Sequence, residues 1–202
     1  MGGSPRLLKM QELWKQVEKC TVCEHLQPHV TKKVFGDGNV SADIVIVGEG
    51  PGEEEDATGH PFVGEAGVLL TDIASHVGLV REEIFIANAV KCRCWLKKGE
   101  KVKNRTPKDS EIAACRHFLA AQLNIVRPKV VIGLGGTAIA ALKGVRLKDV
   151  KSTTMAGMTE KGKNCWFLWT YHPAYPIYRG RDVAIIEQMA RHMKKAKEMA
   201  RG

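Results

Sequence analysis

The sequence has no long apolar run of the kind that crosses a membrane. Its 202 residues contain no stretch of about eighteen consecutive apolar positions, and the opening segment MGGSPRLLKMQ lacks the apolar core of a secretory signal. These absences argue against a membrane protein and against an exported one. We therefore expect an intracellular protein, of the cytoplasm or nucleoid, without a membrane partner.

Internal repeats and low-complexity linkers are also missing from the sequence. This argues against a solenoid and against domains joined by flexible segments. A chain of 202 residues with 44% hydrophobic content can bury a substantial core. We expect residues 1–202 to form one domain and the protein to be a monomer.

Acidic residues are the minority among the charged ones. The chain has 31 Lys and Arg against 22 Asp and Glu, which gives a formal net charge of +9. A positive balance of this size suits a polyanionic partner such as nucleic acid. Many basic proteins bind no nucleic acid, so the charge is compatible with such a partner without establishing it.

Cysteine is present in a pattern that does not indicate disulfides. In an intracellular chain, six cysteines are not expected to form a disulfide framework. They are Cys20 and Cys23 in a C-x-x-C, the distant Cys92 and Cys115, and the further Cys94 and Cys165. A close pair with two distant partners is a ligand set for structural zinc or an iron–sulfur cluster, and the spacing does not choose between them. Ordinary burial of a thiol explains Cys165, which lies in the apolar CWFLW.

Four short apolar runs are separated by longer amphipathic segments. The runs cover residues 43–49, 84–90, 129–135 and 165–172, and the helical patterns between and after them cover 65–79, 107–126, 136–144 and 181–202. Such alternation predicts a parallel sheet flanked by helices. Asp109 or Ser110, behind Pro107, is the expected cap of the second helix.

Each predicted strand ends in a polar or glycine-rich element. These elements are Glu49 with Gly50, Asn88, Gly135 with Gly136, and Tyr171 with His172. Ligands of open parallel sheets bind outside the carboxyl ends of the strands. If the four runs share a sheet, Glu49, Asn88 and His172 converge, and we expect an active site there.

The loop GEGPGEEED, residues 48–56, is not a phosphate-binding motif. It matches neither the dinucleotide fingerprint nor the P-loop, and its four consecutive acidic residues would repel phosphates. The same loop suits a neutral heterocycle, because glycines let backbone amides approach carbonyl groups and Phe62 offers a stacking surface. The sequence therefore favours a site for a neutral heterocycle over a phosphate site.

Several segments, taken in order along the chain, resemble one protein family. They are the C-x-x-C pair, GEGPGEEEDATGHPFVGEAG, IANAVKC, NRTP followed by AAC, RPKVVIGLG and YHPAY. Together they resemble the family 4 uracil-DNA glycosylases, the iron–sulfur members of the uracil-glycosylase superfamily. The resemblance covers nearly the whole chain. It implies an α/β fold, namely a three-layer α/β/α sandwich with a central four-stranded, mainly parallel sheet.

The resemblance also implies a cofactor, a substrate and a reaction. A 4Fe-4S cluster would be held by Cys20, Cys23, Cys92 and Cys115. The enzyme would take uracil out of single- or double-stranded DNA and hydrolyse its N-glycosidic bond, leaving free uracil and an abasic site. The acidic loop would belong to the base pocket, while positive charge lies along the DNA track.

By the same resemblance, three residues would hold the base. Asn88 would read N3–H and O4 of uracil through its amide, Phe62 would stack on the ring, and Glu55 with its loop would exclude the thymine methyl group. Cytosine presents the reverse hydrogen-bonding pattern to such an amide. This predicts selection of uracil over both other pyrimidines.

Three further residues would act on the bond that breaks. His172 and the backbone amide of Gly50 would donate to uracil O2 as charge develops there, and Glu49 would position or activate the attacking water. The family usually has alanine at the position of Gly50, so this chain departs from the pattern. Neither alanine nor glycine supplies a carboxylate at position 50. We therefore expect catalysis to depend mainly on stabilisation of the leaving base.

Other interpretations of these residues stay open at this point. Glu49 is also compatible with a structural acceptor, and His172 with a strand cap. The chain is also compatible with a superfamily member acting on hypoxanthine or xanthine, with a non-catalytic DNA-binding module, or with a zinc-stabilised one. Release of uracil separates enzyme from binder, and the colour of the protein separates iron from zinc.

Two basic segments complete the expected DNA track. Residues 93–105 form a basic insertion relative to the family pattern, and PAYPIYRGR after His172 combines apolar side chains with two arginines. We expect the insertion to be a loop along the DNA backbone, with a solvated loop as the alternative. The second segment suits insertion into a duplex.

Overall fold

The computed structural model describes residues 4–202, and its centre is a six-stranded sheet of order β1-β3-β2-β6-β8-β7. Its four inner strands are parallel: β3 (Phe85–Asn88), β2 (Ile44–Gly48), β6 (Val130–Leu134) and β8 (Trp166–Thr170). They lie within the four predicted runs, so the prediction of a mainly parallel sheet is confirmed. Each run was predicted one or two residues too long at its ends.

The prediction of only four strands was wrong. Two short edge strands, β1 (Asp37–Gly38) and β7 (Thr159–Lys161), pair antiparallel with β3 and β8. They have only two and three residues and are largely exposed. Strands this short carry no alternating apolar pattern, and their pairing depends on neighbours that the local sequence does not specify.

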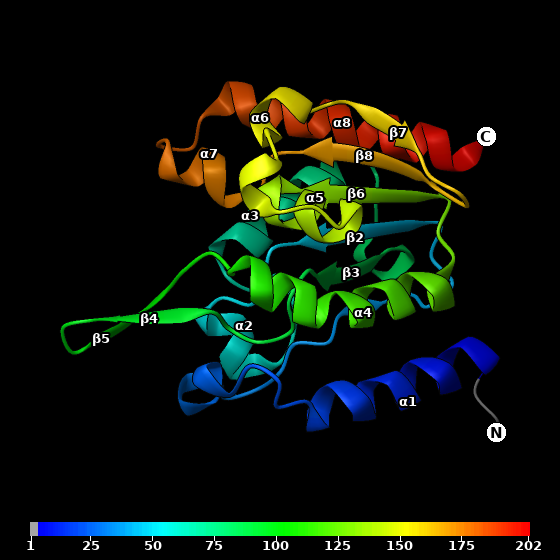
Figure 1. Ribbon diagram of the computed structural model, residues 1–202. Coiled ribbons are helices and arrows are strands. Elements are labelled where there is room, and N and C mark those ends of the chain that lie inside the picture. The colour runs from blue at the N-terminus through cyan, green and yellow to red at the C-terminus, as the bar shows by residue number, and fades with distance from the viewer. Residues whose placement is uncertain (1–3) are drawn as a thin grey trace.

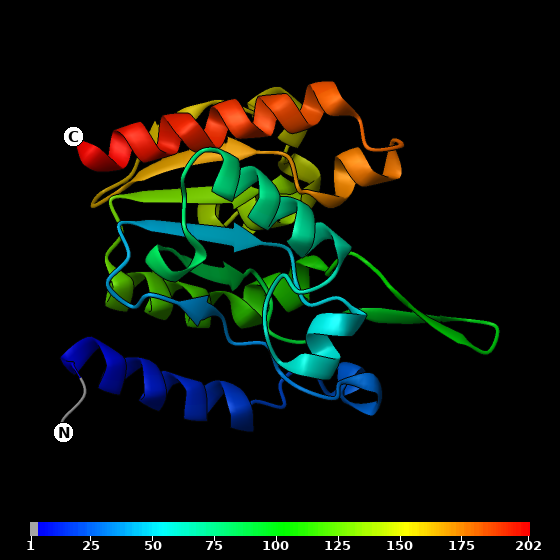
Figure 2. The ribbon, with the colours of Figure 1, turned by 180° about the vertical axis from the view of Figure 1, so that it is seen from behind.

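Helices cover both faces of the sheet (Figures 1 and 2). Those matching the predictions are α3 (Glu65–His76), α4 (Asp109–Val126), α5 (Gly135–Lys143) and α8 (Val183–Arg201). The remaining helical elements are α1 (Pro5–Lys19), η1 (Glu24–His29), α2 (Glu53–Thr58), η2 (Arg81–Glu83), η3 (Leu147–Asp149), α6 (Ser152–Met155) and α7 (Ala174–Tyr178). Helices α1, α4 and α5 lie on one face, and α3 and α8 on the other, which gives the α/β/α layering.

Local sequence explains where several helices begin. The Ser4 hydroxyl accepts from the amide of Leu7, and Pro5 occupies the first turn of α1, where its missing N–H costs no hydrogen bond. Asp182 caps α8 through the amide of Ile185. The expected cap of α4 was wrong: Lys108 precedes the helix, and its amide donates to Glu111 at 2.6 Å.

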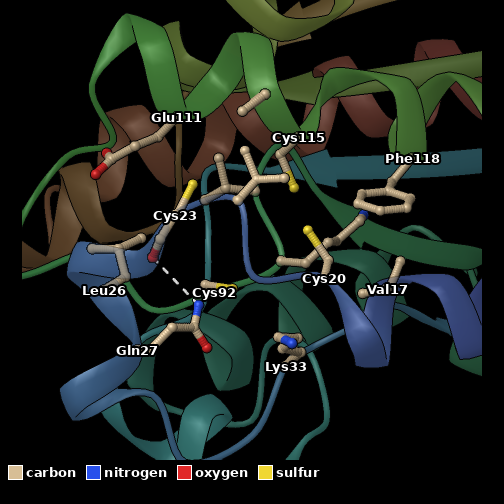
Figure 3. Close-up of a pocket in the computed structure, with 14 residues that line it drawn as sticks. Val17, Cys20, Cys23, Leu26, Gln27, Lys33, Cys92, Glu111, Cys115 and Phe118 are labelled. Atoms are coloured by element: carbon tan, nitrogen blue, oxygen red, sulfur yellow. Dashed lines mark hydrogen bonds between the residues drawn. The ribbon is translucent and has the colours of Figure 1, made fainter.

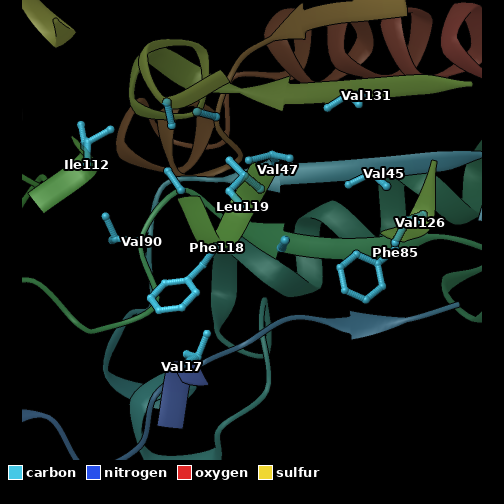
Figure 4. Close-up of a cluster of buried hydrophobic side chains, with 14 of the residues drawn as sticks. Val17, Val45, Val47, Phe85, Val90, Ile112, Phe118, Leu119, Val126 and Val131 are labelled. Carbon is cyan, nitrogen blue, oxygen red and sulfur yellow. The ribbon is translucent and has the colours of Figure 1, made fainter. Parts of the chain in front are cut away.

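The helices pack on the sheet through two apolar cores, one on each face. One packs Val45, Val47 and Val131 of the sheet against Phe118 and Leu119 of α4 (Figure 4). The other packs the opposite face against the Leu70 side of α3 and the Met189 and Met193 side of α8. Burial on both faces explains why the inner strands are continuous apolar runs.

The basic insertion, which we expected to be a loop, forms a hairpin. Strands β4 (Trp95–Lys98) and β5 (Lys101–Asn104) pair antiparallel and project from the body of the protein (Figures 1 and 2). The connection is Gly99–Glu100, with Gly99 at φ 64°, as in a type II′ turn.

Among the helices of residues 4–202, none is both long and apolar enough to span a bilayer.

Candidate active site

A cleft of about 870 Å³ opens at the carboxyl edge of the sheet. Glu49 follows β2, Asn88 ends β3 and His172 follows β8, and all three line this cleft. In the sheet, β2 lies between β3 and β6, so the chain runs to opposite sides of β2 to form these strands. The cleft adjoins this reversal of strand order. The predicted convergence of these residues at one place is confirmed. Gly50, Glu55 and Phe62 line the same cleft.

Asn88 presents an unpaired acceptor in this cleft. Its side chain is almost fully buried, and within residues 4–202 its Oδ1 has no hydrogen-bond partner. An acceptor buried without a donor costs about 1–3 kcal/mol. The arrangement therefore favours a ligand that brings an N–H or O–H to Oδ1.

Phe62 and Asn88 meet because Gly48 has no side chain. A Cβ on Gly48 would overlap the Phe62 ring and lie 2.5 Å from Asn88 Oδ1. The Phe62 backbone is held at φ 55°, a strained value for a bulky residue, and a Cβ on Gly67 would overlap its carbonyl. Two glycines thus permit the aromatic ring to form one wall of the cleft.

The His172 ring is held in one tautomer. Its Nδ1 accepts from the amide of Ala174 at 3.2 Å, so in the neutral ring the proton resides on Nε2. Burial lowers the pKa of His172 to about 4, and the Glu55 charge offsets only part of this. Its ring lies 5.9 Å from that of Phe62, centroid to centroid. Near neutral pH this residue is an uncharged hydrogen-bond donor.

Glu49 is positioned by a residue that follows β6. Its Oε2 accepts from the Thr137 hydroxyl of α5 at 2.6 Å, and no other hydrogen bond to this carboxylate occurs within residues 4–202. Burial raises the pKa of Glu49, and the Thr137 hydroxyl partly opposes the increase. One carboxylate oxygen stays available to a water molecule.

Gly50 is packed tightly against its neighbours. The glycine therefore does not loosen the turn. Its φ is not in the positive range, and a Cβ there would lie 2.7 Å from Val90 Cγ2. The space that alanine would fill is occupied by the Val90 side chain. The backbone amide of Gly50 thus keeps a defined place at the cleft.

The acidic residues of the loop mostly hold the loop itself. Glu55 Oε1 accepts from the amides of Val63 and Gly64 at 3.0 and 2.9 Å, and Oε2 accepts from the amide of Gly52 at 2.9 Å. One carboxylate therefore joins the two glycine-rich turns on either side of α2. This placement makes Glu55 a support of the cleft wall.

Two neighbouring acids tie the loop to other segments. Asp56 is buried, and both of its oxygens accept from the amide of Thr31. Glu53 forms an ion pair with Arg93 at 2.9 Å. Arg93 also donates a hydrogen bond to Asn104 Oδ1. The gathering of carboxylates in a basic protein is thus explained mainly by backbone amides and an arginine.

A second cavity brings four cysteines together (Figure 3). Cys20 follows α1, Cys23 precedes η1, Cys92 follows β3 and Cys115 lies on α4, and all four line the cavity. Its other walls are largely apolar, with Val17, Leu26, Val90 and Phe118. The structure thus gathers the four sequence-predicted ligands, although they come from separate parts of the chain.

The chemistry of this donor set fits an iron–sulfur cluster. In the part of the chain from Ser4 onward, no three Cys, His, Asp or Glu side chains are close enough to hold one metal ion. A 4Fe-4S cluster is larger, and each of its irons takes a separate thiolate. Burial, then the neighbouring Cys115, raises the pKa of Cys92 to about 12, while Lys33 opposes this. A cationic group that binds thiolates would offset that cost.

Cys94 is separated from the cysteine cavity. It lines the active-site cleft, and its thiol lies 3.6 Å from Glu111 Oε2. Glu111 is buried and also receives two hydrogen bonds from Arg105, while His25 Nε2 lies 2.6 Å from it. Burial would raise the pKa of Glu111, but these hydrogen bonds and that from Lys108 hold it at about 2.

Lys91 links the cysteine cavity to Asn88. Its side chain is fully buried, and Nζ donates to the Asn88 carbonyl at 2.9 Å and to Gln122 Oε1 at 2.7 Å. Burial lowers its pKa to about 8. Lys91 therefore fixes the backbone of Asn88, whose side-chain Oδ1 is the unpaired acceptor.

Sequence reasoning missed four residues that shape the cleft. They are Gly48, Gly67, Lys91 and Thr137. A glycine at the end of a buried strand is a signal of close approach, so Gly48 was available to inspection. Nothing in the local sequence marks Thr137 or Lys91, because Thr137 pairs with the distant Glu49, and the burial of Lys91 depends on its contact with the distant Gln122.

Comparison with known proteins agrees with this geometry. A profile of the Uracil DNA glycosylase superfamily matches residues 35–198. The protein named Type-4 uracil-DNA glycosylase from Thermotoga maritima is 40% identical over 191 residues, covering 93% of each chain. Proteins of that name from Archaeoglobus fulgidus and Pyrobaculum aerophilum are 36% and 38% identical, covering 84% of each chain for the first, and 89% of this chain and 92% of the relative for the second. The chain therefore belongs to the uracil DNA glycosylase superfamily.

Proposed function

We propose that this protein removes uracil from DNA by hydrolysing the bond between the base and deoxyribose. The observation that carries the proposal is the buried Asn88 Oδ1, which has no partner among the described residues. Uracil offers N3–H to this acceptor, whereas N3 of cytosine is itself an acceptor. The relatives named Type-4 uracil-DNA glycosylase support the same substrate.

Base flipping delivers the base to the cleft. The bond lies inside the duplex until the nucleotide is turned out of the stack, so the cleft must accept a single base. Phe62 stacks on the uracil ring, and the Asn88 amide takes N3–H and O4. The proposed exclusion of the thymine methyl group falls to the wall that Glu55 supports.

Stabilisation of the leaving base is the main chemical contribution. As the N-glycosidic bond breaks, negative charge develops on uracil O2 while the sugar becomes cationic. His172 donates to O2 from Nε2, which agrees with the bond that Nδ1 accepts from Ala174. The Gly50 amide is the second proposed donor.

Water completes the reaction. Glu49 positions a water molecule through the carboxylate oxygen that Thr137 does not use. The water oxygen bonds to C1′ as the bond from C1′ to N1 breaks, and the water gives up a proton. Uracil leaves with the bonding electron pair and is released after protonation, so the products are free uracil and an abasic site.

Cys20, Cys23, Cys92 and Cys115 are the proposed ligands of a 4Fe-4S cluster. When bound, the cluster supplies a covalent link between the N-terminal segment, the end of β3 and α4. These residues surround one cavity whose walls are largely apolar. The cluster's proposed role is structural, because no cysteine of this set lines the cleft.

The proposed partner is uracil-containing DNA inside the cell, in single- or double-stranded form. The net charge of +9 supports attraction to such a polyanion. One domain and a monomeric state stay predictions.

The test is release of a free base from DNA. Purified protein, brown and containing about four irons per chain if the cluster is bound, is incubated with matched oligonucleotides carrying uracil, thymine, cytosine or hypoxanthine. We expect free uracil and abasic DNA from the first substrate only. Release of hypoxanthine without uracil would assign the other specificity, and binding without release of any base would contradict the enzyme.

A further inference from the structure

The β4–β5 hairpin has two chemically different faces. Cross-strand partners share a face, and so do alternate residues along each strand. The register pairs Leu96 with Lys103 and Lys98 with Lys101, so these four side chains lie on one face. The opposite face carries Trp95, Lys97, Val102 and Asn104. We call the first the lysine face.

The lysine face carries positive charge without an anionic partner in the part of the chain that the structure describes. Lys98, Lys101 and Lys103 are all exposed, and no ion pair involves them. Lys98 and Lys101 are direct cross-strand neighbours, and like charges in such pairs destabilise a sheet. An external anion would remove this repulsion.

The base of the hairpin is firmly anchored. Trp95 Nε1 donates to the Leu26 carbonyl at 2.8 Å, and its ring contacts His29 edge to face. The Arg105 amide donates to the Cys94 carbonyl, and its guanidinium binds Glu111. An isolated two-stranded ribbon is only marginally stable, so these contacts give the exposed part a defined direction.

The hairpin stands beside the cleft. Asn104, Arg105, Thr106 and Pro107, at its base, line the cleft together with Tyr175 and Tyr178 of α7 on the other rim. Hairpin and α7 project from the same end of the protein in both views (Figures 1 and 2). A DNA strand that places one nucleotide in the cleft therefore continues past the hairpin on one side of that nucleotide.

We propose that the lysine face of the hairpin binds the backbone phosphates of DNA on one flank of the nucleotide held in the cleft. Lys101 and Lys103 alternate along β5, about 7 Å apart, and Lys98 lies opposite Lys101 on β4, so the three lysines present an extended charged surface and not a single point. The exposed Leu96, on β4 opposite Lys103, completes this face. Lys97, on the opposite face, is not part of this contact. The proposal rests on the proposed function only for the identity of the nucleotide in the cleft.

The first experiment compares two triple variants of equal charge. Lys98→Gln/Lys101→Gln/Lys103→Gln removes the lysine face, and Lys9→Gln/Lys163→Gln/Lys194→Gln removes three exposed lysines from α1, the β7–β8 turn and α8. Binding is measured against salt with DNA carrying 2′-fluorodeoxyuridine, whose glycosidic bond resists cleavage. We expect the salt slope of the hairpin variant to fall by about 0.9 for each phosphate that its lysines no longer neutralise, and that of the control to change much less.

Two further arms localise the contact. Lys97→Gln should change the slope less than Lys101→Gln, although both lie on the hairpin. Substrates with uracil near the 5′ or the 3′ end should separate the flanks: the weaker binding of the hairpin variant should persist on one and vanish on the other. Equal slopes for the two triple variants, or equally weakened binding to both truncated substrates, would overturn the proposal.

The outcomes separate this proposal from the proposed function. If the parental protein releases no uracil, the enzymatic proposal fails, while the binding comparison still tests the lysine face. If uracil is released but the hairpin variant behaves like the control, only the hairpin proposal fails. Thermal unfolding of each variant checks that the substitutions leave the fold intact.

Discussion

The active-site cleft and the cysteine cavity differ in what completes them. The cleft is open and lined by both polar and apolar groups; backbone amides donate to Glu55 in its wall, and Asn88 carries one unpaired acceptor. The cavity is mostly apolar apart from its four thiols. The cleft is thus arranged for a neutral, flat ligand, and the cavity for a group that binds sulfur.

The two regions also draw their stability from different sources. Glycines permit the cleft walls to approach, and the acidic loop is fixed by short-range hydrogen bonds. In the cavity, burial raises the pKa values of Cys92 and Cys115, so ligand binding must supply the free energy to deprotonate them. Lys91 and Glu111 stand between the regions, because each lines the cavity and bonds to a residue of the cleft.

The largest expected effect concerns the cavity. Cys92→Ala should abolish the brown colour and the bound iron, because this thiol lines the cavity, while Cys94→Ala should keep both. Iron analysis of anaerobically purified protein measures the difference. Loss of iron in Cys94→Ala but not in Cys92→Ala would reassign the ligand and break the division between the two regions.

The next effect concerns the cleft alone. His172→Ala should slow single-turnover uracil release by roughly 10²- to 10³-fold, the usual cost of one oxyanion donor. DNA binding should change much less and the iron content should stay at the parental value, since His172 lies outside the cavity. A variant that releases uracil at the parental rate would make His172 a structural residue.

A smaller effect is expected at Asn88, the residue proposed to read the base. Asn88→Asp exchanges the amide donor for an oxygen, so uracil release should fall by roughly 5- to 150-fold, which corresponds to about 1–3 kcal/mol. Asn124→Asp, an exposed change of the same chemistry on α4, is the matched control. Equal single-turnover rates for the two variants would show that Asn88 does not contact the base.

The sequence predicted the place of the site better than its internal contacts. Glu49, Asn88 and His172 follow buried strands, and the ends of parallel strands meet at one edge, so their convergence follows from strand order. The partners of these residues do not. Thr137 reaches Glu49 across 88 positions of sequence, and no local pattern encodes such a pairing.

Acidic residues and short strands marked the limit of what a sequence pattern predicts. Four consecutive carboxylates excluded a phosphate site, yet which amides Glu55 binds depends on the folded loop. Edge strands β1 and β7 were missed because two or three exposed residues carry no periodicity. The sequence predicted a loop where β4 and β5 form a hairpin, although the Gly99–Glu100 turn is a hairpin signal.

The smallest effect is on stability against pH. The pKa of His172 is lowered from its ordinary 6.5 to about 4, so unfolding takes up a proton within this range. The contribution of neutral His172 to the free energy of unfolding is complete above pH 6.5 and is lost as the pH falls toward 4. Between pH 7 and 5, the parental melting temperature should therefore fall more than that of His172→Gln, which cannot titrate. Parallel curves would show that the ring is not desolvated.

In the proposed function, recognition of the base depends above all on the unpaired side-chain Oδ1 of Asn88, which accepts N3–H of uracil. Single-turnover base release is compared for two otherwise identical oligonucleotides, one with deoxyuridine and one with 3-methyldeoxyuridine. We predict rapid release of uracil and a decrease of at least about tenfold for the methylated base, which has no N3–H to donate. Equal release of both bases would contradict this role of Asn88.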